Sequence, residues 1–240
     1  MASEHIVKSY DEELRKLSNT ITEMGGLAEN QLAAAIDAVV QRDSKLAAGV
    51  VEGDAKVDQL QRDIDNLAIR LLALRQPMAR DLREIFAALK MASDLERICD
   101  YAANVAKRSI ALNQTPPVRP VYALPRMAHL AQLLVKDVLD AYVARDADKA
   151  YSVWIRDAEL DEMYSSLFRE LLTYMMEDPR NISACTHLLF MAKNIERIGD
   201  HATNIAEDLY YLVHGTPLTE ARPKGDQSSL EILSPGRSTQ

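Results

Sequence analysis

The sequence predicts an all-α protein built from two tandem, pseudo-symmetric three-helix bundles, with six long helices in total. Three observations lead to this fold class: the composition, the positions of the prolines, and an internal repeat. Aromatic residues make up 5% of the 240 residues and glycine occurs eight times. Ala, Leu, Met, Glu, Arg and Lys are plentiful, and these side chains favour helices.

The prolines divide the chain into long periodic segments. Four of the nine lie between residues 113 and 126, three follow Gly215, and only Pro77 and Pro179 lie elsewhere. An interior proline costs a helix about 3 kcal/mol, so these positions mark helix ends. The predicted helices span 3–42, 44–75, 79–112, 124–145, 147–177 and 179–214, and Gly25-Gly26 is expected to weaken or bend the first. The predicted domains are a first bundle (1–113), a Pro-rich linker (114–125), a second bundle (126–215) and a disordered tail (216–240).

The second half of the chain repeats the first. Residues 91–106 and 191–206 are identical at nine of sixteen positions, at an offset of 100. Upstream residues match at an offset of 103, as Asp54 and Asp58 match Asp157 and Asp161. The three-residue difference belongs in a loop, since three residues lost inside a helix would turn later side chains by about 60°. Pro77 and Pro179 already mark that loop. Because each unit is small, the two bundles are expected to pack together.

Carboxylates recur on the polar faces of both units at i, i+4 spacing, which places each pair on one helix face. Consecutive helices should run antiparallel, so the four carboxylates of a unit can converge on an outward stripe, with the apolar seam nearly opposite. The candidate metal ligands are Asp54, Asp58, Glu96, Asp100, Asp157, Asp161, Glu196 and Asp200. Asn104 and Asn204 are further candidates on the same stripes.

A cation would offset the like charges in these pairs, each of which destabilises a helix by a few tenths of a kcal/mol. Carboxylate oxygens suit hard ions such as Mg, Mn, Ca or Fe(III). A solvated acidic helix face is the alternative interpretation, and the sequence leaves both open. No histidine lies at metal-ligand spacing, which argues against a zinc hydrolase or a ferritin-like oxidase. His201 is expected at the surface, and Arg97 is expected to pair with nearby acids.

Charge and hydropathy narrow the class of protein. The net charge of −8 disfavours nucleic acid as a partner, because phosphate backbones attract basic surfaces. No apolar run approaches the roughly 20 residues that span a bilayer, so we expect a cytoplasmic protein that reaches a membrane only through partners. Cys99 and Cys185 are interpreted as buried thiols, with a disulfide as the alternative.

The chain resembles the PhoU family, the accessory regulators of bacterial phosphate-specific transport, from about Tyr10 to Gly215. The strings that carry the resemblance are Met24-Gly-Gly-Leu27, Arg75-Gln-Pro77 with Asp81-Leu-Arg83, Tyr174-Met-Met-Glu-Asp178, and the E-R-I-x-D segments Glu96–Asp100 and Glu196–Asp200. The first E-R-I-x-D segment departs from the usual family form, because Cys99 stands where Gly199 stands in the second. We expect this difference to alter local packing more than coordination.

The resemblance implies metal ions (Fe, Mn, Mg, Zn or Ca) at the eight carboxylates, a homodimer, and negative regulation of the phosphate-starvation response. It also implies contacts with the ATPase of the phosphate ABC transporter and with the sensor histidine kinase and its response regulator. The leading hypothesis is therefore an adaptor with metal-binding acidic motifs and no catalytic activity. A metal-free helical scaffold and a carboxylate-bridged metal enzyme are the alternatives.

Overall fold

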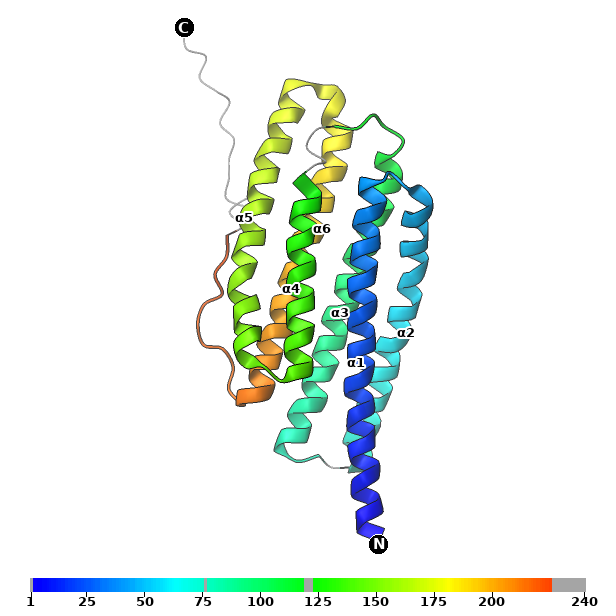
Figure 1. Cartoon of the computed structure of the whole chain (residues 1–240), viewed down its shortest axis with the longest axis vertical. Coiled ribbons are helices and arrows are strands. Elements are labelled where there is room, and N and C mark those ends of the chain that lie inside the picture. The colour runs from blue at the N-terminus through cyan, green and yellow to red at the C-terminus, as the bar shows by residue number, and fades with distance from the viewer. Residues whose placement is uncertain (1, 76, 119–122, 226–240) are drawn as a thin grey trace.

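The computed structural model describes residues 2–75, 77–118 and 123–225, with the side chains of residues 2–9 set aside. The described residues form six α-helices and one short 3₁₀ turn, and contain no strand. The helices are α1 (Ala2–Val40), α2 (Ser44–Arg75), α3 (Ala79–Leu112), α4 (Leu124–Ala144), α5 (Ala147–Glu177) and α6 (Ile182–His214), with the turn η2 (Pro179–Asn181) before α6. Figure 1 shows them side by side in one elongated body, with α2 and α5 at its two outer edges.

The all-α, two-bundle prediction is confirmed, and α3 and α6 form the seam between the bundles. The two helices are antiparallel, because Lys90 near the start of α3 bonds Asp208 near the end of α6 at 2.6 Å. At the other end of the seam, the Arg108 guanidinium stacks over the Phe190 ring, 4.1 Å from its centroid. The matched residues of the two repeats thus meet across an approximate two-fold axis.

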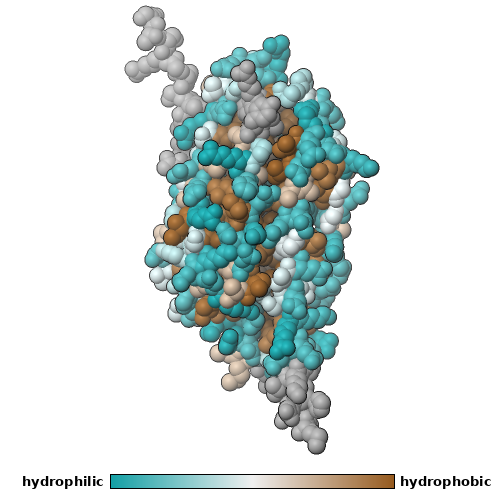
Figure 2. Space-filling view, viewed as in Figure 1, coloured by the Kyte–Doolittle hydropathy of each residue, from teal (hydrophilic) through white to brown (hydrophobic). Residues whose placement is uncertain are grey.

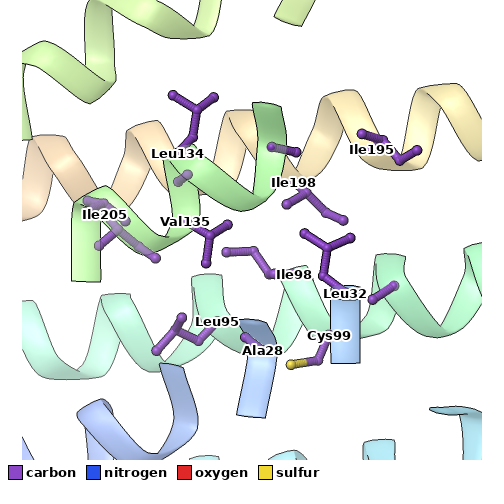
Figure 3. Close-up of a cluster of buried hydrophobic side chains, with 14 of the residues drawn as sticks. Ala28, Leu32, Leu95, Ile98, Cys99, Leu134, Val135, Ile195, Ile198 and Ile205 are labelled. Carbon is purple, nitrogen blue, oxygen red and sulfur yellow. The ribbon is translucent and has the colours of Figure 1, made fainter. Parts of the chain in front are cut away.

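One hydrophobic core runs through both bundles. Figure 3 shows side chains of α1, α3, α4 and α6 meeting in a single cluster, with Ile98 of α3 beside Val135 of α4. Burial of apolar area at about 25 cal/mol per Å² is the main force that holds such helices together. On the face drawn in Figure 2, hydrophobic residues are interspersed with hydrophilic ones. Within the described residues, no helix combines the length and the hydropathy needed to cross a bilayer.

The first two helices of each unit are joined by a tight turn with an arginine in the left-handed region. Arg42 has φ 54° and its counterpart Arg145 has φ 56°, so α1 and α4 end earlier than predicted. This conformation costs a non-glycine residue roughly 1–2 kcal/mol. Side-chain contacts offset the cost, since Arg42 bonds the carbonyls of Asn113 and Thr115 at 2.8 and 2.6 Å and Arg145 pairs with Glu84.

Gly25 brings α1 and α4 close together. A Cβ at this position would lie 2.5 Å from Cδ2 of Leu139, whereas a Cβ at Gly26 would meet nothing within 4 Å. The helix α1 continues through both glycines without a break. The glycine pair, where a weakened or bent helix was expected, therefore includes one residue whose missing side chain leaves room for Leu139 of α4.

The described part of the C-terminal segment has a defined path. Gly215 ends α6 with φ 75°, as a left-handed C-cap. Residues 216–225, part of the predicted disordered tail, then follow the outer side of α5 in extended form (Figure 1). Residues 226–240 of that tail and residues 119–122 of the predicted linker lie outside the described residues.

Candidate functional site

The i, i+4 spacing predicts that the four carboxylates of each unit converge, and in both units the structure places them on two neighbouring helices. In the first unit, α2 contributes Asp54 and Asp58 and α3 contributes Glu96 and Asp100; these residues form cluster 1. Burial, followed by the charge of Asp100, raises the pKa of both Asp54 and Glu96. The Gln31 amide lies within 3.5 Å of both Asp54 Oδ1 on α2 and the Cys99 carbonyl on α3, so the two helices present their acids side by side.

Polar side chains already bond the acids of cluster 1. The amide Nε2 of Gln31, on α1, donates to Oδ1 of Asp54 at 3.4 Å and to the Val50 carbonyl at 3.2 Å. Arg97 lies on the outer side of α3, where its guanidinium is 3.1 Å from Oδ2 of Asp100 and 3.5 Å from Oε2 of Glu96. The predicted pairing of Arg97 with neighbouring acids is confirmed. All four carboxylates of cluster 1 remain half-buried.

Cluster 2 consists of Asp157 and Asp161 on α5 and Glu196 and Asp200 on α6. The expected outward stripe is wrong for this cluster, because the exposed fractions of Asp157, Asp161 and Glu196 are 1%, 3% and 4%. Burial raises the pKa of Asp157 to about 6, despite a neighbouring guanidinium, and that of Glu196 to about 7. The acids of cluster 2 therefore lie between α5 and α6 and only Asp200 stays half-buried.

One residue that contributes to the difference between the clusters is Gly199. A Cβ at Gly199 would collide with Oδ1 of Asp157 and would lie 2.5 Å from Cδ2 of Leu160. In cluster 1 the equivalent position holds Cys99, whose side chain is fully buried. Gly199 thus lets the Asp157 carboxylate approach α6 closely, whereas Cys99 fills the corresponding space and leaves Asp54 less buried. Both cysteines are free and buried, as interpreted from the sequence.

Two basic residues of the chain enter cluster 2. Lys193, on α6, bonds Oε1 of Glu196 at 2.8 Å. Arg222, on the C-terminal segment, pairs with Oδ2 of Asp157 and lies 2.8 Å from Oδ1 of Asp200. The backbone N–H of Gly225 donates to Oδ2 of Asp161 at 2.9 Å. Each of the four acids is thus contacted by the chain itself.

Sequence reasoning missed Arg222, Lys193 and Gln31. Lys193 stands where the first repeat has Ser93, and this difference between the repeats is the sequence signal that could have found it. No pattern pointed to Arg222, because its contacts depend on where a segment without periodicity folds back. Gln31 lies on the apolar face of α1, and a polar residue in that pattern could have indicated a buried hydrogen-bond partner. The structure shows the residue 8% exposed.

Two of the three remaining positions named from the sequence, His201 and Asn204, lie at the seam between the bundles. His201 is a half-buried interface residue, with Nδ1 2.6 Å from Oδ1 of Asp94 and its ring 5.5 Å from that of Tyr101. The surface placement expected for His201 is therefore wrong, because α3 covers that side of α6. Asn204 donates to the same Asp94 carboxylate at 3.2 Å, so it points away from cluster 2. Asn104 is half-buried on α3, on the same helix as Asp100.

The donor chemistry of the clusters fits a hard cation. Among the described residues, Oδ1 of Asp157 and Oε2 of Glu196 are buried oxygens that accept no hydrogen bond, and a buried acceptor without a partner is costly. As the side chains stand, however, no three Asp, Glu, His or Cys groups within the described ranges are arranged to hold one ion. Cation binding would therefore require Arg97 to move at cluster 1, and Arg222 and Lys193 at cluster 2.

The fold and the paired clusters define a duplicated α-helical bundle protein with two acidic sites on opposite outer edges. Comparison with known proteins gives the family. The PhoU domain model matches twice, over residues 21–109 and 124–209, and the chain belongs to the PhoU family.

The relatives match along almost their whole length. A protein of Caulobacter vibrioides (strain NA1000 / CB15N), named phosphate-specific transport system accessory protein PhoU homolog, is 54% identical over 93% of this chain and 98% of its own. A homolog of the same name from Rhizobium meliloti (strain 1021) is 51% identical, over 95% and 97%. The crystal structure of PhoU from Pseudomonas aeruginosa superposes with a TM-score of 0.84 at 43% identity, over 86% of this chain and 100% of that one.

Proposed function

We propose that this protein is an accessory regulator of a phosphate-specific transport system, and that it acts as a cytoplasmic adaptor and not as an enzyme. In this proposal it contacts the ATPase of the phosphate ABC transporter and the sensor histidine kinase, and it represses the phosphate-starvation response when phosphate is plentiful. Its membership of the PhoU family, along nearly its whole length, is the observation that carries the proposal. A homodimer is part of the same expectation.

Removal of the gene tests the regulatory role. A deletion strain grown in ample phosphate should express its phosphate-scavenging genes, and the full-length gene supplied on a plasmid should restore repression. Expression is measured by transcript levels in high and low phosphate, with the transporter genes intact in every strain. Normal repression in the deletion strain would contradict the proposal.

We also propose that cluster 1 binds a divalent or trivalent metal ion through Asp54, Asp58, Glu96 and Asp100. Three observations support this proposal: the four carboxylates share one space, burial raises the pKa of two of them, and the one nearby cation among the described groups that bonds them, Arg97, is mostly exposed. A bound ion would supply the positive charge that four adjacent acids lack. Cluster 2 would use the equivalent Asp157, Asp161, Glu196 and Asp200.

Neutralising two acids of cluster 1 should abolish its metal binding. Glu96→Gln/Asp100→Asn should weaken the binding of Mn²⁺ by more than the roughly 10–100-fold that loss of an outer-shell partner causes. The measurement is titration calorimetry on metal-stripped protein, with elemental analysis of gently purified native protein beside it. The matched control is Glu52→Gln/Asp63→Asn, which removes two exposed acids of α2 and should leave the affinity unchanged. Equal affinities for the two double variants would contradict the assignment.

A metal-free scaffold is the second candidate, and the position of Arg222 favours it. A guanidinium already bridges two acids of cluster 2, which shows that the cluster accepts a basic side chain. In that case cluster 1 would bind an arginine or lysine of a partner protein, and metal-stripped protein would still capture the transporter ATPase. The third alternative, a carboxylate-bridged metal enzyme, would need a metal-activated water. Catalytic turnover by the wild-type protein that is lost in Asp100→Asn would support it.

A further inference from the structure

Cluster 2 differs from cluster 1 in having a segment of the chain laid across it. The chain leaves α6 at Gly215 and runs along α5 (Figure 1). In the first unit α3 continues instead into residues 113–118, and no segment of the described residues lies across cluster 1 in the same way. Three successive contacts fix the segment on α5. Glu220 contacts Tyr151, Arg222 contacts Asp157, and Gly225 contacts Asp161.

The central contact places a cation at the middle of the cluster. The Arg222 guanidinium pairs with Asp157 and Asp200, which lie on different helices, and its side chain is only 15% exposed. A guanidinium presents several N–H donors in a fixed plane, so it can bond two carboxylates at once as a metal ion does. Removing such a buried partner leaves uncompensated negative charge, which strongly attracts another cation.

The flanking residues show that the segment fits this site. The Tyr151 hydroxyl donates to Oε2 of Glu220 at 2.8 Å, beside the ring of Trp154. At the other end, a Cβ on Gly225 would lie 2.8 Å from the Ala158 carbonyl, so only glycine allows its N–H to reach Asp161. A small residue at the point of closest approach, an anchored carboxylate and a bridging arginine together form a built binding site.

The acids of cluster 2 retain capacity for a stronger ligand. Oδ1 of Asp157 and Oε2 of Glu196 accept no hydrogen bond from any group in the described part of the chain, although their residues are 1% and 4% exposed. Arg222 and Lys193 supply two positive charges against four carboxylates. An incoming ion that displaced Arg222 would find unpaired oxygens already directed into the site.

We propose that residues 217–225 are an intramolecular ligand of cluster 2, with Arg222 as its resident cation, so that divalent ions enter this cluster only when the segment leaves. The two clusters are therefore not equivalent: the acids of cluster 1 are half-buried, and cluster 2 is covered by the chain's own C-terminal segment. The part that concerns metal ions rests on the function proposed above, whereas docking of the segment does not.

Docking is tested without metal by hydrogen exchange on the full-length chain. In the wild-type protein the Gly225 amide should be protected, and in Arg222→Ala it should exchange roughly tenfold faster or more, because that loss frees the segment locally. Lys224→Ala is the matched control, since Lys224 is an exposed neighbour on the same segment, and it should exchange like wild type. Equal exchange in wild type and Arg222→Ala would overturn the proposal.

Gating is tested by Mn²⁺ titration in the Glu96→Gln/Asp100→Asn background, where cluster 2 is the remaining acidic cluster. Adding Arg222→Ala should tighten Mn²⁺ binding at least about tenfold and adding Lys224→Ala should not, with circular dichroism confirming that each variant is folded. No gain, or no binding with Arg222→Ala, would overturn the gating. The metal site proposed at cluster 1 is tested separately. If that proposal is wrong, proteins that keep all four acids of cluster 1 will bind Mn²⁺ only weakly.

Discussion

Gly199→Ala is expected to destabilise the protein by about 1–2 kcal/mol, although alanine normally stabilises a helix. Replacing glycine inside a helix gains up to about 1 kcal/mol, but overpacking a filled site costs about 1–3 kcal/mol. At Gly199 the added methyl group would collide with Asp157 and Leu160, both fully packed between α5 and α6. In a chain of this size each kcal/mol shifts the melting temperature by about 2–4 °C.

Thermal melting of metal-stripped protein measures the effect, and Gly26→Ala supplies the matched control. Gly26 is also inside a helix, and a Cβ there would meet nothing within 4 Å, so this variant should melt at a slightly higher temperature. Gly199→Cys reproduces the residue of the first unit and should behave like Gly199→Ala or worse. A rise in melting temperature for both glycine-to-alanine variants would contradict the prediction, because it would show that a methyl group fits between α5 and α6 at Gly199.

Glu196→Gln is expected to stabilise the metal-stripped protein above neutral pH and to leave it unchanged near pH 5. Burial raises the pKa of Glu196 to about 7, above its ordinary value of 4.5, although the Lys193 ammonium opposes the shift. Between these two values the folded state holds a proton that the unfolded chain has released. The free energy of unfolding therefore falls as pH rises through this window, and above it the full cost of the buried charge is present.

Glutamine has the same shape and no charge, so the variant avoids that cost. The expected gain at pH 8 is about 1–2 kcal/mol, discounted because Lys193 loses its counter-ion. Urea titrations at pH 5 and pH 8 in the presence of a chelator provide the measurement. Glu159→Gln, an exposed position on α5, is the control and should give parallel curves with wild type at both pH values. A loss of stability at pH 8 would mean that the Lys193–Glu196 ion pair outweighs burial.

Most of the fold could be predicted from the sequence because the repeat and the prolines report on local structure. Pro77 and Pro179 fall between helices, and the acids at i, i+4 spacing converge wherever two helices run antiparallel. The misses share a physical cause. Arg42 and Arg145 end their helices in a left-handed conformation that only distant carbonyl and carboxylate groups offset. Such compensation depends on tertiary contacts, which periodicity does not encode.

For the candidate site, too, the features set by local helix geometry could be predicted and those set by tertiary contacts could not. The pairing of the eight carboxylates follows from helix geometry. The burial of Asp157 depends instead on Gly199, which leaves room for its carboxylate, and on Arg222, which lies against it. The sequence shows that Cys99 and Gly199 differ, but only the packing of α5 against α6 shows which one admits a carboxylate. Arg222 could not be found, because its partners precede it by 65 and 22 positions along the chain and share no pattern with it.

The continuous core through α1, α3, α4 and α6 has a thermodynamic consequence. With no internal boundary to separate the halves, the two bundles should unfold in one cooperative transition and not in two steps. A ligand held at one edge then stabilises the opposite edge equally, by RT ln(1 + [L]/Kd). Binding at a single acidic cluster would therefore stabilise all six described helices, including those of the other bundle.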